Sequence, residues 1–282
     1  MQSPISALVG PGSQPGEDDG QAIEILRMPS GMTTFSAAHL PEPEAVAALG
    51  GGIAAGDAIL AALEGWCADR APRMVPLAGL SGEERAFVRE LLSEGEVSVI
   101  GGATLQAQES VLAGVWYVRE TDPAGGLVDE RVEVAPFPPS LLAIAFAGAA
   151  EALPMAETFP ENVFNAPALI PEINAHLPTI AEGALASHVV NLSLLPHTPE
   201  DLTYLDDLLG TGPLIILSRG YGNCRIRATA TRNLWWVRYY NSQDTLILNS
   251  IELSRLPEVA VAAPEDLADS RERLAEIMDI YR

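Results

Sequence analysis

The chain of 282 residues contains no lysine, so all 16 of its basic side chains are arginines, and 38 carboxylates outnumber them. The resulting formal charge of −22 disfavours nucleic acids and anionic membranes as partners and favours basic ones. Cys67 and Cys224 are too few for a disulfide framework, which is typical of a reducing, cytoplasmic compartment. No apolar run reaches the roughly 18 residues of a membrane span, and the N-terminal segment lacks the basic and apolar regions of a signal peptide.

Cofactor and catalytic motifs are missing as well. The sequence GYGN (220–223) has neither the spacing nor the lysine of a phosphate-binding loop, and no two histidines stand at metal-ligand spacing. Two distant cysteines cannot hold an iron–sulfur cluster without outside ligands. A Cys224 nucleophile would need His188 or His197 as its base, and nothing in the sequence brings these residues together. The sequence therefore predicts neither a metal nor a cofactor.

The composition is that of a globular protein, with 48% hydrophobic and 19% charged residues. Residues 1–43 are rich in proline, glycine and acid, and we expect them to form an extended arm. The rest divides into residues 44–152 and 153–282, because the second segment repeats the pattern of the first.

Aligned stretches in the two segments lie 117 residues apart and, after a two-residue insertion, 119 residues apart. These stretches are LSGEERAFVRELLSEGEVSVI (80–100) with HTPEDLTYLDDLLGTGPLIIL (197–217), VWYVRE (115–120) with LWWVRY (234–239), and LVDERVEV (127–134) with LILNSIEL (246–253). An internal duplication is the simplest account of this self-similarity.

Both copies carry the same signals for a capped amphipathic helix. The signals are the N-caps Ser81 and Thr198, the capping-box residue Glu84, Pro199 at the first helical position, and the terminal glycines Gly95 and Gly212. Another helix and a short strand precede each capped helix, and a meander of three or four strands follows it. We therefore expect an α+β fold of two tandem homologous helix–(strand)–helix–β-meander repeats, with mixed or antiparallel sheet and helices packed on one face. The other expected helices cover about 44–70, 166–186 and 264–281.

One stretch differs from the rest of this acidic chain. SRGYGNCRIRATATRNLWWVRYYNS (218–242), here called the arginine strip, contains five arginines and no carboxylate. The first copy reads GGATLQAQES at this place, so the glycine turn, the cysteine and four of the arginines occur in the second copy alone. The candidate binding residues of the strip are Arg219, Tyr221, Asn223, Cys224, Arg225, Arg227, Arg232, Asn233, Trp236, Arg238 and Tyr240.

Alternation along residues 224–231 directs Cys224 to one side of a strand and Arg225 and Arg227 to the other. Cys224 is then either a small buried side chain or a thiolate stabilised by the neighbouring arginines. The arginines either pair with carboxylates elsewhere in the chain or bind a partner.

The tryptophans divide between the two faces of the third strand of each meander. Trp116 and Trp235 occupy equivalent positions, which predicts a shared place in the core. Trp236, Arg238 and Tyr240 share the opposite face. An arginine among aromatic residues is either an interface anchor or part of a sheet surface beneath a helix.

Three motifs around the strip are highly specific: RGYGNCRIRAT (219–229), RNLWWVRYYNS (232–242) and LILNSIEL (246–253). In them the sequence resembles the HupH/HyaF/HoxQ family, accessory proteins of [NiFe] uptake hydrogenase operons. Weaker matches extend the resemblance over nearly the whole chain: GPGSQP (10–15), MPSGMTTF (28–35), LPEPE (40–44) and ETFPENVFNAPALIPEI (157–173). Leu234, Arg238, Tyr240 and Ser250 depart conservatively from the family pattern, in which glutamine is common at the position of Arg238.

The resemblance implies a non-enzymatic maturation factor in the cytoplasm. Its client would be the hydrogenase small subunit, which carries iron–sulfur clusters and a twin-arginine signal peptide, before assembly with the large subunit and export. The acidic surface would attract the basic signal peptide, while the arginine strip contacts another part of the client and the arm folds over it. The alternative is that Cys224 acts as a redox thiol, handling sulfur or protecting clusters against oxygen with a thioredoxin-like partner from the same operon.

Overall fold

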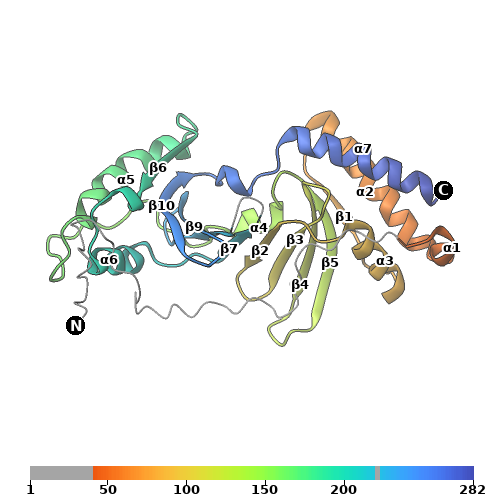
Figure 1. The fold of residues 1–282 in the computed structure, drawn as a ribbon, viewed down its shortest axis with the longest axis horizontal. Helices are drawn as coiled ribbons and strands as arrows, with labels where there is room; N and C mark the ends of the chain where they lie inside the picture. The colour runs from red at the N-terminus through yellow and green to blue at the C-terminus, as the bar shows by residue number, and fades with distance from the viewer. Residues whose placement is uncertain (1–40, 220–222) are drawn as a thin grey trace, which may run out of the picture. The chain divides into compact units, whose positions relative to one another are not determined.

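The computed structural model describes residues 41–219 and 223–282, so Tyr221 and nearly all of the expected arm lie outside the described residues. This part of the chain is α+β (Figure 1). The first half contains α1 (Pro43–Val46), α2 (Gly50–Asp69), β1 (Arg73–Pro76), α3 (Gly82–Leu92), β2 (Val97–Gly101), β3 (Leu105–Glu109), β4 (Val115–Thr121), β5 (Leu127–Val134) and α4 (Pro139–Ile144). The second half contains α5 (Ala166–Ala181), β6 (Ser187–Asn191), η1 (Leu192–Leu194), α6 (Pro199–Leu209), β7 (Leu214–Ser218), β8 (Asn223–Ala228), β9 (Leu234–Tyr240), β10 (Leu246–Ser254), η2 (Glu258–Ala260) and α7 (Pro264–Ile280).

The ten strands form one sheet in the order β1-β5-β4-β3-β2-β7-β8-β9-β10-β6. Every pair of neighbouring strands in it is antiparallel. Read inward from either edge, the two halves place their strands in the same relative order. They join at β2 and β7, where Val99 lies opposite Ile216, its equivalent 117 residues later. The two meanders therefore share one continuous antiparallel sheet.

The helix that precedes each meander begins with a capping box, which the sequence predicts for the first helix only. The Ser81 hydroxyl accepts a hydrogen bond from the backbone N–H of Glu84, whose carboxylate accepts one from the N–H of Ser81. Thr198 and Asp201 form the same reciprocal pair in the second half. The sequence predicts Thr198 as the N-cap, and the structure adds Asp201 as its reciprocal partner.

The glycines expected to end these helices have a different role. The helices end at Leu92 and Leu209, before Gly95 and Gly212. The N–H of Gly212 donates to the backbone oxygen of Ala228 at 2.8 Å, and Gly95 donates to Glu109 in the same way at 2.7 Å. A Cβ atom at Gly212 would lie 2.6 Å from the backbone oxygen of Thr229. Glycine is needed here because the backbone of the following hairpin passes too close for a side chain.

Helices cover both faces of the sheet, which corrects the expectation of one covered face. Trp116 and Trp235 are buried in a central core with residues of α4, and their indole N–H groups donate to backbone oxygens at 3.0 Å. On the opposite face α2, α3 and α7 pack over β4 and β5, while α5 and α6 pack over β9 and β10. Both faces need cover because Val115–Val118 and Leu234–Val237 are buried at every position.

The last helix lies in the core of the first half. Leu267, Leu274 and Met278 of α7 are buried in the same cluster as residues of α2 and α3, and α7 runs beside α2 in Figure 1. No helix in the described residues combines the length and the apolar composition needed to cross a bilayer.

Candidate interaction face

Six residues of the arginine strip gather on one face of β8 and β9. Arg225 lies opposite Arg238, Arg227 opposite Trp236, and Asn223 opposite Tyr240. Directly opposed residues of antiparallel strands project to the same side of a sheet. The structure therefore brings these predicted candidates together.

Aromatic rings lie beneath three of the guanidinium groups. The Arg225 guanidinium lies 4.5 Å from the centre of the Tyr240 ring, and those of Arg238 and Arg227 lie 4.4 and 5.3 Å from the Trp236 ring. Trp236 itself is only 2% exposed, within the core formed with α5 and α6. The Trp236 ring is therefore part of the sheet surface beneath the helices, where it supports the arginines and is not itself exposed.

Carboxylates of the same chain neutralise part of the strip. Arg227 donates to Asp206 of α6 at 2.5 Å and to the Thr211 hydroxyl at 2.9 Å. Arg232 pairs with Glu151 at 2.9 Å. Arg227 and Arg232 thus follow the interpretation in which carboxylates elsewhere in the chain neutralise the arginines.

The other two arginines of this face, Arg225 and Arg238, keep positive charge that is available to a partner. Arg225 approaches Asp244 only to 3.7 Å, and both side chains are exposed to solvent. Arg238 forms no ion pair with any residue of 41–219 or 223–282, and its described interaction is the stacking on Trp236. We therefore regard Arg225 and Arg238 as the cationic centre of the candidate site.

Three further candidates, Arg219, Arg232 and Asn233, lie outside β8 and β9. Arg232 and Asn233 form the turn between β8 and β9, where Asn233 adopts a φ of 60°. The backbone oxygen of Asn233 accepts a hydrogen bond from Ser254 at 3.0 Å. Arg219 follows β7 and donates its backbone N–H to Glu96 at 3.1 Å. The sequence motif thus combines residues of the face with residues of the adjoining turns.

Cys224 projects to the opposite side of the sheet, into the central core beside Trp235 and Val237. It is 3% exposed, and this burial raises the pKa of its thiol to about 11, which a hydrogen bond with Tyr239 only partly offsets. His188 cannot act as its base, because it lies on β6, three strands from β8. Burial agrees with the first interpretation of Cys224 and opposes a thiolate.

Cysteine labelling provides a test with an internal control. A maleimide reagent should modify the half-buried Cys67 of the native protein and leave Cys224 unmodified, whereas both should react after unfolding in urea. Mass spectrometry of labelled peptides distinguishes the two sites. Rapid labelling of native Cys224 would contradict its burial and restore the redox alternative.

The first half adds an ion cluster to the same face, for which the sequence contains no local signal. Glu130 of β5 has a buried carboxylate, and the nitrogens of Arg119, Arg85 and Arg89 lie 3.1, 3.6 and 4.0 Å from it. The side chains of Arg89 and Arg119 are about half exposed. Three guanidinium groups around one carboxylate leave a surplus of positive charge here.

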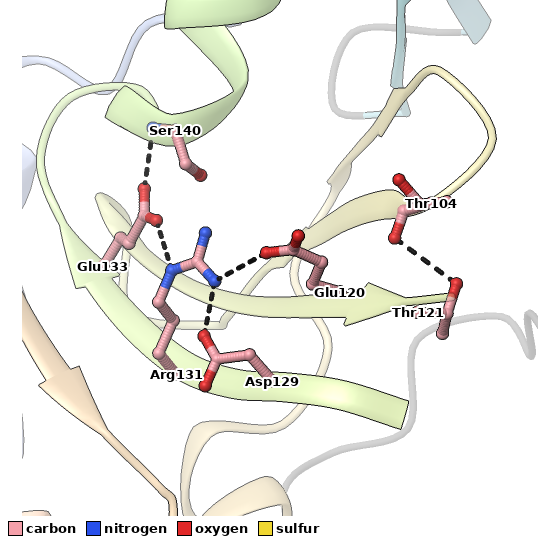
Figure 2. Close-up of polar contacts among 7 residues, drawn as sticks. All are labelled: Thr104, Glu120, Thr121, Asp129, Arg131, Glu133 and Ser140. Carbon is pink, nitrogen blue, oxygen red and sulfur yellow. Dashed lines mark hydrogen bonds and ion pairs between the residues drawn. The ribbon is translucent and has the colours of Figure 1, made fainter. Parts of the chain in front are cut away.

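The single arginine of β5 shows the opposite balance. Figure 2 shows Arg131 between the carboxylates of Glu120, Asp129 and Glu133, at 3.7, 2.6 and 2.8 Å. Glu133 also accepts the backbone N–H of Ser140 at the start of α4. Because carboxylates surround this buried guanidinium, Arg131 has a structural role and is not available to a partner.

Comparison with known proteins identifies close relatives. A family model described as the C-terminal conserved region of the HupH hydrogenase expression protein matches residues 54–154 and 163–281. The hydrogenase expression/formation protein HupH of Rhodobacter capsulatus is 46% identical over 275 residues, covering 97% of this chain and 96% of the relative. HoxQ of Cupriavidus necator is 43% identical over 273 residues, covering 96% and 95%. A solved HupH structure from Thiobacillus denitrificans is 31% identical, covers 41% of this chain and 95% of its own, and has a TM-score of 0.39.

Proposed function

This chain belongs to the HupH hydrogenase expression protein family, and on that premise we propose that it is an accessory protein in the maturation of a [NiFe] uptake hydrogenase. The observation that carries this proposal is the similarity over nearly the full length to proteins named for hydrogenase expression or formation. We further propose that it acts in the cytoplasm, without catalysis, by holding the iron–sulfur small subunit before assembly and twin-arginine export.

Two surface properties support a binding role. The formal charge of −22 produces a long-range attraction for a basic signal peptide, which added salt would weaken. Arg225 and Arg238 form a cationic site on a sheet face, supported by Tyr240 and Trp236, and suit contact with a different part of the client.

We also propose that the halves, 44–152 and 153–282, arose by duplication. The shared order of elements, the pairing of equivalent residues at the β2–β7 join and the two matched segments of the family model support this origin. Helix α7 belongs to the second half but packs with α2 of the first half, so the halves are successive segments of the chain and do not form separate compact domains.

Co-purification from cells that express the whole hydrogenase operon tests the function. The tagged chain should recover the small subunit, and deletion of the client's twin-arginine signal peptide should reduce recovery, most clearly at low salt, because the acidic surface then loses its basic partner. Quantitative mass spectrometry of both subunits gives the measurement. Recovery of the large subunit alone, or of neither subunit, would contradict the proposal.

A further inference from the structure

The face that carries Arg225 and Arg238 continues across the join between the halves. The cross-strand partners of Arg227 lead through Ile215, Ile100 and Gln106 to Arg119 on β4. A neighbouring row, again formed by direct partners, consists of Arg238, Arg225, Leu217, Ser98, Gln108 and Tyr117. Direct partners project to the same face, so each row lies on one side of the sheet. The two rows share that side, because their residues are two positions apart on each strand, as Arg225 and Arg227 are. We call the two rows together the central face.

The middle of the central face contains three apolar side chains with polar ones beside them. Ile100, Ile215 and Leu217 are partly exposed and belong to none of the three hydrophobic cores of 41–219 and 223–282. On the other side of the same strands, α4 packs on β2 and β3. The helices α3 and α6 cover only the ends of the central face, over β4 and β9. A band of four strands, β3, β2, β7 and β8, with a width on the order of 19 Å, thus remains between them.

Positive charge flanks this apolar band on both sides. Arg225 and Arg238 lie at one side, and Arg119 with Arg89 lies at the other, where one carboxylate serves three guanidinium groups. Elsewhere the chain is strongly acidic. The arrangement complements a segment that has an apolar stripe and carboxylates beside it.

We propose that the central face binds an acidic amphipathic segment of the client, with contacts from both halves of the chain. This proposal rests on the function proposed above and adds the chemistry of the bound segment and the role of Arg119. The apolar stripe of the segment packs on Ile100, Ile215 and Leu217, and its carboxylates reach the arginines on either side. A width of about 19 Å corresponds to roughly 13 residues of α-helix or six residues of extended chain.

Two substitutions of Gln106 test the proposal, because an effect of charge changes binding in opposite directions and a structural disturbance does not. The side chain of Gln106 is exposed, lies between Arg119 and Ile100 in the row, and occupies the position equivalent to Arg225. Gln106→Glu should weaken binding of an acidic segment about 3- to 10-fold, and Gln106→Arg should strengthen it by a similar factor. A mere disturbance of the strand would weaken binding in both variants.

The experiment uses the full chain and three probes. They are the purified small subunit, overlapping peptides that cover its sequence, and a synthetic helix of about 14 residues with a leucine stripe and flanking glutamates. A version of the helix with lysines in place of the glutamates is the control. Dissociation constants are measured by fluorescence anisotropy, and thermal unfolding of each variant reports on its folding.

Opposite shifts in the two Gln106 variants, with preference for acidic peptides and for the glutamate helix, would support the inference. Equal shifts, preference for basic peptides, or no binding of the glutamate helix would overturn it. If the glutamate helix binds but the small subunit does not, the proposed client is wrong while the chemistry of the face stands. Dimer formation that Gln106→Glu alters would assign the face to a second copy of the chain and overturn the inference.

Discussion

Replacing Gly212 with alanine should lower the free energy of unfolding by about 3 kcal/mol. The added Cβ would lie 2.6 Å from the backbone oxygen of Thr229 and 3.0 Å from that of Ala228. These atoms cannot rotate away as a side chain would, because the N–H of Gly212 holds the same hairpin through Ala228. Gly95→Ala should have a similar effect, since its Cβ would collide with the backbone oxygen of Ser110. Urea unfolding followed by circular dichroism measures the loss.

Gly82→Ala is the matched control, because no atom lies within 4 Å of the added Cβ. Its unfolding free energy should remain within about 0.5 kcal/mol of the original. The two sensitive glycines share no partner residue, so the double variant should lose about 6 kcal/mol, comparable to the whole stability of many domains. A double variant that folds with unchanged stability would contradict the close approach of helix and hairpin in both halves.

Asp201→Asn should destabilise the protein by about 2 kcal/mol at neutral pH. Asp201 is fully buried at the start of α6, and its carboxylate accepts backbone N–H groups from Phe164, Asn165, Ala166 and Thr198. Burial alone would raise the pKa of this carboxyl, but the four hydrogen bonds outweigh burial and lower the pKa to about 2. The charged carboxylate thus ties the start of α5 to the start of α6.

The pH dependence of this loss follows from the lowered pKa. A carboxyl with a lower pKa in the folded state contributes its stability above the unfolded pKa of about 4 and loses it as pH falls towards 2. The difference between Asp201→Asn and the unaltered protein should therefore be constant above about pH 5 and shrink below pH 4. Glu84→Gln, at the equivalent position, should lose less, because Glu84 is more exposed and binds two N–H groups. A difference that is independent of pH would show that Asp201 stabilises the fold without its charge.

Local signals in the sequence predicted the elements and their starts. Ser81 and Thr198 are caps in the structure because the groups that satisfy them lie within three residues in the chain. Alternation placed Cys224 and Arg225 on opposite sides of the strand, because the direction of successive side chains is set locally, and the structure then showed that the side of Cys224 is the core. The ends of the capped helices were misassigned, because glycine indicates both a helix end and a close backbone approach.

Long-range pairing was not predictable from these signals. The join of Val99 to Ile216 depends on which strand edges meet, and neither sequence encodes its partner locally. The cover on both faces did have a signal: VWYV and LWWV are apolar without interruption, which is typical of strands buried on both sides. Alternation elsewhere in the meanders suggested a single buried face.

For the candidate site as well, local sequence predicted some features and only the tertiary structure revealed the others. The sequence located the arginine strip, but the partner of Arg227 is Asp206 on a helix, which only tertiary packing brings near. The alignment of 115–120 with 234–239 makes Arg119 the equivalent of Arg238, yet its place on the same face requires the register of β2 with β7. Symmetry between the halves was therefore the useful signal, since equivalent arginines lie on the same face, on either side of the join, when the two meanders pair edge to edge.

The central claim is that the cationic sheet face of the second half contacts the client. Capture of the purified small subunit by Arg225→Glu/Arg238→Glu, compared with Arg271→Glu/Arg273→Glu on α7, tests it at equal net charge. The account predicts a loss of about tenfold or more in affinity for the first pair and nearly unchanged capture for the second. Equal capture by both variants would contradict the account and remove the arginine strip from client binding.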